Sequence, residues 1–162
     1  MIWLPPATPV RVWADSSAFE VFARAFARGE YHAEVKRNGF RALFYREASG
    51  PPALWSRHQR QFRAEEYAGL IQNWANKTIP PDTLVDGELL TSRRAGAKLD
   101  ECGAYYLFDV LVWEGLDIRQ EPIEVRRRFV DRLAIGRVAV FAPEWQNGAD
   151  LRTLYDDAVA DE

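Results

Sequence analysis

The chain has 162 residues, enough for one domain with its own hydrophobic core. Hydrophobic residues make up 48% and charged residues 28%, which excludes a disordered or fibrous chain. The formal net charge of -3 excludes a chain that is basic over its whole surface, so any contact with nucleic acid requires a local basic patch. No apolar run is long enough to span a membrane, and we expect no membrane association.

The single cysteine, Cys102, excludes an intrachain disulfide and fits a reducing compartment. The first ten residues carry no basic side chain and contain three prolines, which is unlike a signal peptide. The sequence shows no repeat, low-complexity tract or linker. We therefore expect a cytoplasmic protein with a single domain over residues 1–162.

The first elements in chain order are a helix and a hairpin. Ser17–Glu20 has the pattern of a capping box, which predicts a helix that ends at Gly29. Strand-like runs follow at Tyr31–Lys36 and Phe40–Arg46, separated by Asn-Gly. Because both residues of an Asn-Gly pair tolerate positive φ, the two runs are expected to form a hairpin.

The rest of the chain alternates short strands with helices. We expect a helix whose core side is formed by Tyr67, Leu70, Ile71 and Trp74. The expected elements are strands at Ala53–Ser56, Thr83–Leu90, Ala104–Trp113 and Arg137–Phe141, and helices at Ala64–Asn76, Ile123–Leu133 and Asp150–Ala160. This mixture predicts an α+β fold built on antiparallel sheets with flanking helices.

The segment from Glu34 to Arg41 is the first candidate site. In a plain hairpin, Lys36 and Arg41 would be solvated residues on either side of the turn. In a reactive site, Lys36 would be a nucleophile, and Gly39 would let the backbone approach a phosphate. The residues alone leave both interpretations open.

Asp86, Gly87 and Glu88 interrupt an apolar strand and form the second candidate. Carboxylates within such a strand are costly if they are buried without a partner. One interpretation is a β-bulge with both carboxylates in solvent. The other makes Glu88 a ligand for a ribose hydroxyl or a metal ion.

Phe108 and a basic segment are further candidates. Phe108 is either a core side chain or a stacking platform for a purine. Arg57, His58 and Arg60 belong either to a solvated loop or to a surface that holds nucleic-acid phosphates. The helical arginines Arg126–Arg128 are expected to form a solvated helical face.

The order of these segments resembles that in the covalent nucleotidyltransferases. Residues Lys36–Arg41, KRNGFR, resemble the lysine motif K-x-D-G-x-R, with Asn38 in the position of the aspartate. Ser56-Arg57 resembles the S-R element that follows it, and Asp86–Glu88 resembles the D-G-E motif.

The later residues narrow the resemblance to ATP-dependent DNA ligases. Leu107–Leu111, followed by Arg126–Arg128 and Leu133, is similar to the F-D-x-L…R-R…L stretch of those enzymes. The resemblance runs from about Glu34 to the end of the chain. It implies the N-terminal portion of an ATP-grasp-like nucleotidyltransferase domain of a DNA ligase.

The resemblance also implies an activity and a set of roles. Lys36 would form a lysyl-AMP intermediate from ATP with Mg²⁺, and AMP would then pass to a DNA 5′-phosphate for nick sealing in repair, replication or recombination. The implied nucleotide-binding residues are Glu34, Asn38, Gly39, Arg41, Glu88 and Phe108, with Glu88 also a metal ligand. The implied nucleic-acid-binding residues are Arg57, His58 and Arg60.

Two departures from the family pattern keep alternatives open. Asn38 preserves turn geometry but removes a negative charge. The later lysine motifs and the OB-fold domain of the family do not occur before Glu162. We therefore expect partners beyond nicked DNA, either a C-terminal half or OB domain in cis or trans, or a second copy paired through open sheet edges. The alternatives are an RNA ligase or capping-type enzyme, and a catalytically incomplete relative that binds nucleotide or nucleic acid.

Overall fold

The computed structural model describes Arg24, Ala27, Arg28, 34–63, 66–67, 69–90, 103–134, 140–142 and Thr153. The chain divides into two compact units, of which the larger contains Arg37–Ala142. The other contains Ala7–Lys36 and Pro143–Glu162. The expectation of a single domain over 1–162 stays a prediction.

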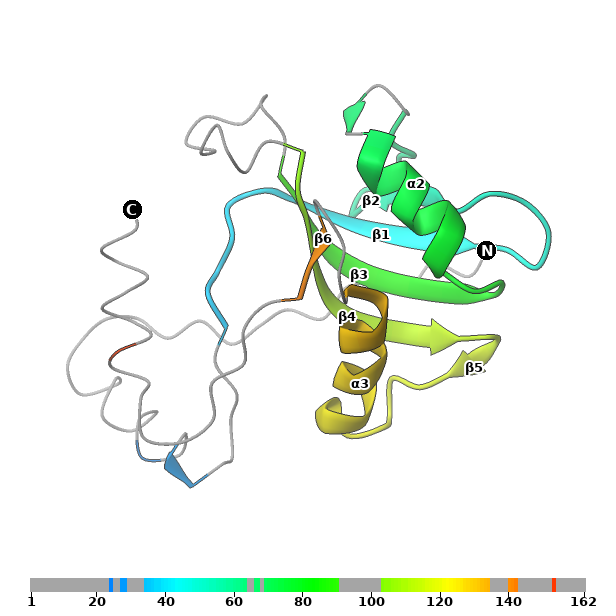
Figure 1. The fold of residues 1–162 in the computed structure, drawn as a ribbon. Coiled ribbons are helices and arrows are strands. Elements are labelled where there is room, and N and C mark those ends of the chain that lie inside the picture. Colours follow the sequence, from blue (N-terminus) through cyan, green and yellow to red (C-terminus); the bar gives the residue numbers. More distant parts are fainter. Residues whose placement is uncertain are drawn as a thin grey trace. The chain divides into compact units, whose positions relative to one another are not determined.

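The larger unit is a sheet with helices on one side (Figure 1). Its described elements are β1 (Phe40–Arg46), β2 (Ala53–Ser56), α2 (Gly69–Thr78), β3 (Thr83–Leu89), β4 (Tyr105–Trp113), β5 (Leu116–Asp117), α3 (Ile123–Ala134) and β6 (Val140–Phe141). The strand order is β2-β1-β3-β4-β5, with antiparallel pairing throughout, and β6 pairs in parallel with β4. The predicted α+β class is confirmed.

The core lies between the sheet and the two helices. Phe44 of β1 makes edge-on contacts with Trp74 of α2 and with Tyr105 of β4, at ring-centroid distances of 5.8 and 5.3 Å. The Trp74 indole N–H donates to the carbonyl oxygen of Leu133 at 2.8 Å, which joins α2 to α3. Both helices therefore cover the same side of the sheet, as Figure 1 shows.

The opposite side of the sheet, called here the far face, carries most of the polar strand residues. Directly opposed residues of neighbouring strands point to the same side, and the register pairs Arg41 with Glu88, and Glu88 with Tyr106. The intervening residues Ala42 and Gly87 face the helices. Strand alternation thus separates a helix-covered core from the far face, where Asp86 and Glu88 lie on the same strand as the buried Leu84.

The predicted hairpin at Asn38-Gly39 is wrong. Glu34–Asn38 form no strand, and β1 pairs instead with β2 and β3. The two-residue turn with positive φ at both positions lies at Glu114-Gly115, between β4 and β5, with φ of 48° and 85°. The local Asn-Gly preference is overridden because long-range pairing of β1 with β3 takes precedence.

The strand expected at Ala53–Ser56 has the same bounds in the structure, and several other expected elements have shifted ends. The helix expected from Ala64 is observed from Gly69, and Leu70 is 56% exposed rather than part of the core. Ile71 and Trp74 are buried as predicted. Among the described residues of the predicted terminal helices, Arg24, Ala27 and Thr153 are helical, and the rest of those helices lies outside the described part of the chain.

The outer edge of β2 is bonded to the chain's own following segment. The Ser56 N–H donates to the Arg60 carbonyl oxygen at 2.8 Å, and the Phe62 N–H donates to the Leu54 carbonyl oxygen at 2.8 Å. These bonds use groups that a second chain would need for strand pairing. Neither α2 nor α3, nor any other helix in the described part of the chain, is long and apolar enough to cross a membrane.

Gly87 provides a test of how closely β3 and β4 pack. A Cβ atom at this position would lie 2.3 Å from the Tyr106 carbonyl oxygen and 2.6 Å from the Tyr105 ring. We predict that Gly87→Ala lowers the free energy of unfolding by about 2–3 kcal/mol, as overpacking does. The measurement is urea unfolding.

Gly69→Ala is the matched control. A Cβ atom there has no neighbour within 4 Å, and the residue is helical. Alanine should change the free energy of unfolding by less than about 1 kcal/mol, in the stabilising direction. If both variants lost the same free energy of unfolding, the close packing around Gly87 would not be the reason that alanine is unfavourable there.

Candidate functional site

Four predicted nucleotide-binding residues come together at one end of the sheet. Arg41 and Glu88 are direct cross-strand neighbours on β1 and β3. The Arg41 guanidinium lies over the Phe108 ring at 5.8 Å, and Gly39 contacts Glu88. These contacts join residues that lie 47 to 67 positions apart in sequence.

Asp86 fixes the orientation of Arg41. The side chain of Asp86 is 2% exposed, and both of its carboxylate oxygens accept hydrogen bonds from the guanidinium, with Arg41 Nε at 2.6 Å from Oδ1. Burial raises the pKa of Asp86, and the adjacent Arg41 opposes that rise. The sequence interpretation that both carboxylates of the D-G-E segment point to solvent is therefore wrong for Asp86.

A β-bulge accompanies this pair but lies on β4. Asp86 pairs with Asp109 and Gly87 with Leu107, which leaves Phe108 as the extra residue. A bulge reorients the side chains beside it. Phe108 is half-buried and packs at the edge of a cluster that contains Leu90 and Tyr106, so it is neither a pure core residue nor fully exposed.

Glu88 holds the backbone of the lysine motif. Its Oε1 atom accepts the Gly39 N–H at 2.8 Å. A Cβ atom at Gly39 would lie 2.6 Å from the Leu89 carbonyl oxygen and 2.8 Å from the Glu88 Cγ. Gly39 has no positive φ, so glycine is required here for close approach and not for turn geometry.

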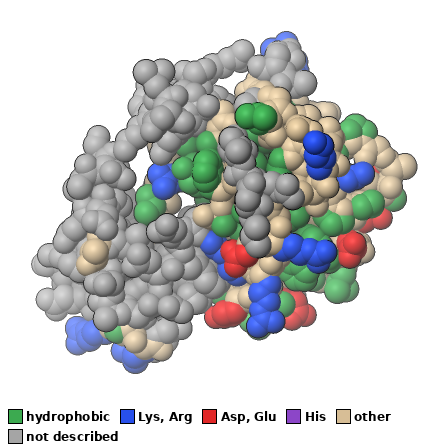
Figure 2. Space-filling model, viewed as in Figure 1, with side chains coloured by type: hydrophobic (Ala, Val, Ile, Leu, Met, Phe, Trp, Pro, Cys, Tyr) green, Lys and Arg blue, Asp and Glu red, His purple; other side chains and the backbone are tan. Residues whose placement is uncertain are grey.

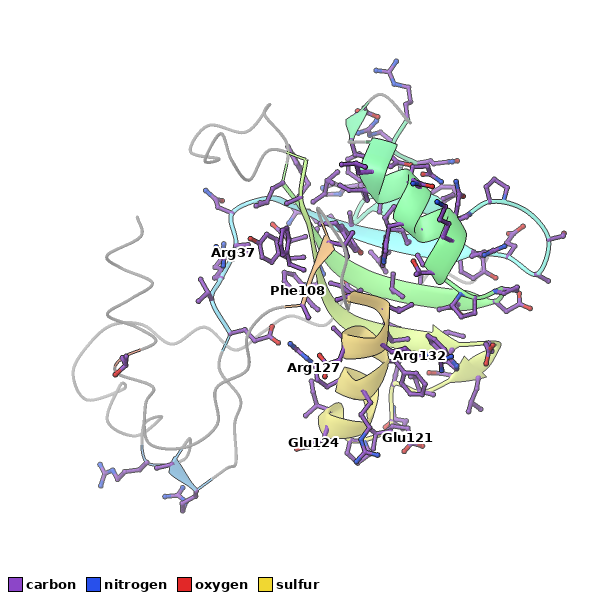
Figure 3. The ribbon with its side chains drawn as sticks, viewed as in Figure 1. Arg37, Phe108, Glu121, Glu124, Arg127 and Arg132 are labelled. Carbon is purple, nitrogen blue, oxygen red and sulfur yellow. The ribbon has the colours of Figure 1, made fainter. Side chains whose placement is uncertain are left out.

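The structure adds Arg37 and Tyr106, which the sequence analysis did not single out. The Arg37 guanidinium lies 4.6 Å from the centroid of the Tyr106 ring, and the Tyr106 ring stacks on Phe141 at 5.3 Å. Figure 3 shows Arg37 and Phe108 at the same end of the sheet, beside β6. No local pattern predicts this contact, because it joins the lysine motif to β4 about 70 residues later.

Glu34 and Lys36 belong to the other compact unit, and both are exposed. Their roles in nucleotide binding and catalysis stay predictions. Lys36 directly precedes Arg37 in the chain. Asn38, which directly follows Arg37, is also exposed.

The predicted nucleic-acid-binding residues occupy a tight turn after β2. The Ser56 hydroxyl accepts the backbone N–H groups of His58 and Arg60 at 3.3 and 3.2 Å, and Gln59 has a φ of 62°. Arg57 and His58 are exposed, and Arg57 Nε donates to His58 Nε2 at 3.0 Å.

Arg60 is more constrained than its neighbours in this turn. Its guanidinium donates to both carboxylate oxygens of Glu66, at 3.0 and 3.2 Å, and lies over the Phe62 ring. Glu66 also accepts the Arg63 N–H at 2.7 Å. These contacts lower the pKa of Glu66 to about 2, with the hydrogen bond from Arg60 as the largest cause.

The prediction of a solvated face at Arg126–Arg128 is wrong for two of the three residues. Arg126 donates to Asp109 of β4 at 2.9 Å and to the Glu121 carbonyl oxygen at 2.6 Å. Arg127 is 9% exposed and pairs with Asp131 at 3.0 Å. Figure 2 shows acidic and basic side chains beside one another over α3, a mixed rather than a uniformly basic surface.

The described residues contain no group of three or more His, Cys, Asp or Glu side chains that could hold a metal ion. Glu88 is nevertheless compatible with the predicted Mg²⁺. Magnesium in nucleotide sites is held by one or two carboxylates together with substrate phosphates, so a dedicated protein cage is not needed.

The fold of this chain is similar to that of solved DNA ligase structures. This likeness confirms at the level of fold the resemblance seen in the sequence. No protein-family model matches the sequence, and no curated protein matches it significantly.

Three solved structures illustrate the likeness. The ligase domain of LigD from M. tuberculosis has a TM-score of 0.56 and 19% identity, over 78% of this chain and 44% of that one. Mycobacterial DNA ligase D complexed with ATP and MES has a TM-score of 0.55 and 19% identity, over 79% and 44%. Pmar-Lig_Pre has a TM-score of 0.56 and 20% identity, over 80% and 35%. The chain thus spans less than half the length of the structures it matches.

The Arg41–Asp86 pair gives a prediction about stability. Arg41→Met should lower the free energy of unfolding by about 3 kcal/mol, because it leaves a buried carboxylate without its partner. The double variant Arg41→Met/Asp86→Leu should regain most of that loss, since no buried charge remains. Urea titration measures both. A double variant as unstable as the single one would show that Asp86 is not what makes Arg41 necessary for stability.

Glu66 gives a prediction about pH. The pKa of Glu66 in the folded protein, about 2, lies below the ordinary value of 4.5 for a glutamate carboxyl. Its contribution to stability is therefore present above about pH 4.5 and is lost as the pH falls through about 2. Wild type should therefore be more stable than Glu66→Gln at about pH 6, and the difference should shrink towards about pH 2. The exposed Glu47→Gln variant is the control, and a Glu66→Gln difference that stays constant over this range would contradict the assignment.

Proposed function

We propose that this chain is the N-terminal portion of the adenylation domain of an ATP-dependent DNA ligase. The observation that carries the proposal is the convergence of Gly39, Arg41, Glu88 and Phe108 on one end of the far face. These residues come from three separate segments that the sequence had linked to one nucleotide site. The ATP-grasp-like description of the complete domain belongs to the same proposal.

Lys36 is the proposed AMP acceptor. Its neutral amine attacks the α-phosphorus of ATP, a P–N bond forms, the P–O bond to pyrophosphate breaks, and the amine loses a proton. Only two residues separate Lys36 from Gly39, whose backbone is bonded to Glu88. The chain itself therefore keeps the lysine backbone within about 11 Å of that anchor.

The far face offers contacts for the nucleoside. Phe108 is half-buried beside the Arg41 guanidinium and provides a ring for base stacking. Glu88 is proposed to bind a ribose hydroxyl, and Glu34 to accept a hydrogen bond from the adenine amino group. Arg41, oriented by Asp86, supplies positive charge near the bound nucleotide.

Magnesium would be held by Glu88 and the nucleotide phosphates. When bound, it offsets negative charge as pyrophosphate leaves. The residues that this chain contributes position the nucleotide, and positioning supplies most of the catalysis in phosphoryl transfer.

Nicked DNA is the proposed second substrate. The exposed Arg57 and His58, at the turn after β2, are suited to phosphate contacts. Arg60 would serve only if a phosphate competes with Glu66 for its guanidinium. Sealing is proposed to require the later motifs of the family, supplied in cis or in trans, because the chain spans less than half of the ligase structures that it matches.

Adenylation at Lys36 is testable by labelling. The protein that carries this chain is incubated with α-labelled ATP and Mg²⁺, and the label is mapped by mass spectrometry. We predict AMP on Lys36 and no label in Lys36→Arg, because a guanidinium stays protonated and is a poor nucleophile. Lys77→Arg, which alters an exposed lysine of α2, is the control and should label normally. Label on another lysine would remove the basis of the proposal.

A further inference from the structure

Arg37 and Tyr106 form a contact that the family motifs do not include. Arg37 occupies the unspecified position after the lysine, and its guanidinium lies 4.6 Å from the centroid of the Tyr106 ring. Tyr106 is 9% exposed and stacks on Phe141. A ring held from behind in this way offers a fixed platform for a cation.

The register places this contact beside the other anchor of the lysine motif. Tyr106 of β4 is paired directly with Glu88 of β3. Glu88 accepts a hydrogen bond from the Gly39 N–H, and the Tyr106 ring makes a cation–π contact with the Arg37 guanidinium. One cross-strand pair therefore holds the chain at two points, on residues 37 and 39.

We infer that Arg37 and Tyr106 are positioning residues for Lys36, because their contact fixes the backbone that carries the nucleophile. This inference rests on the proposed adenylation of Lys36. The Glu88 bond holds the chain at Gly39, and the contact with Tyr106 holds it at the residue next to Lys36. Reactions that depend on alignment lose rate when the nucleophile is misplaced by even about 1 Å.

A positioning role predicts a specific kinetic signature. Arg37→Ala should slow single-turnover lysyl-AMP formation by about 3- to 30-fold, the range that cation–π contacts span. The ATP concentration that gives half-maximal rate should stay unchanged, because neither residue is assigned a contact with ATP. Arg37→Lys should recover part of the rate, and Tyr106→Phe, which keeps the ring, should behave as wild type.

Tyr106→Leu removes the ring but also disturbs a buried position, so it is used within a double-mutant cycle. If the two side chains act through their mutual contact, Arg37→Ala/Tyr106→Leu should be no slower than Tyr106→Leu alone. Additive losses would overturn the inference. So would an Arg37→Ala variant whose half-maximal ATP concentration rises at unchanged maximal rate, because that result assigns Arg37 to nucleotide binding.

Hydrogen exchange tests the anchor without relying on activity. Arg37→Ala should accelerate exchange of the Gly39 amide by about 3- to 30-fold, while the Phe44 amide in β1 stays as in wild type. Unchanged exchange at Gly39 overturns the inference even if Lys36 is adenylated. Absence of label on wild-type Lys36, with accelerated exchange in the variant, instead refutes the proposed function and leaves the anchor supported.

Discussion

The buried carboxylate of Asp86 is the constraint on which the arrangement of the far face depends. A charge that is 2% exposed in the middle of a strand is costly without a partner, and Arg41 satisfies both of its oxygens. That requirement fixes the guanidinium of Arg41 between β1 and β3. Because Arg41 also lies over Phe108, the same pair sets the position of a cation beside the proposed base platform.

One side of the sheet carries the main hydrophobic core, and the other side carries the proposed nucleotide site. On the helix side, Phe44, Trp74 and Tyr105 pack closely, and the Tyr105 hydroxyl donates to the Ala42 carbonyl oxygen at 2.9 Å. On the far face, Arg41, Asp86 and Glu88 lie on the same strands as Leu43 and Leu84 of a second buried cluster. Because successive side chains of a strand point to opposite faces, one sheet can carry a core on one face and a proposed nucleotide site on the other.

Strands β1, β3 and β4 and helix α3 were predictable to within one residue at each end, because their apolar patterns are long and regular. What the sequence did not reveal depends on residues far apart in the chain. Gly39 reads locally as a hairpin turn, but its requirement comes from Leu89 and Glu88. The burial of Asp86 follows from Arg41, 45 residues earlier. The motifs predicted four residues that meet on the far face, and long-range packing determined how they meet.

The central claim is that the far face, at Arg41, Glu88 and Phe108, is where the adenine nucleotide binds. Photolabelling with an azido-ATP analogue, followed by peptide mapping, tests it most directly. The account predicts label within Tyr105–Asp109 that is suppressed by excess ATP and strongly reduced in Phe108→Ala. Label confined to α2 or α3, or label that ATP does not displace, would contradict it.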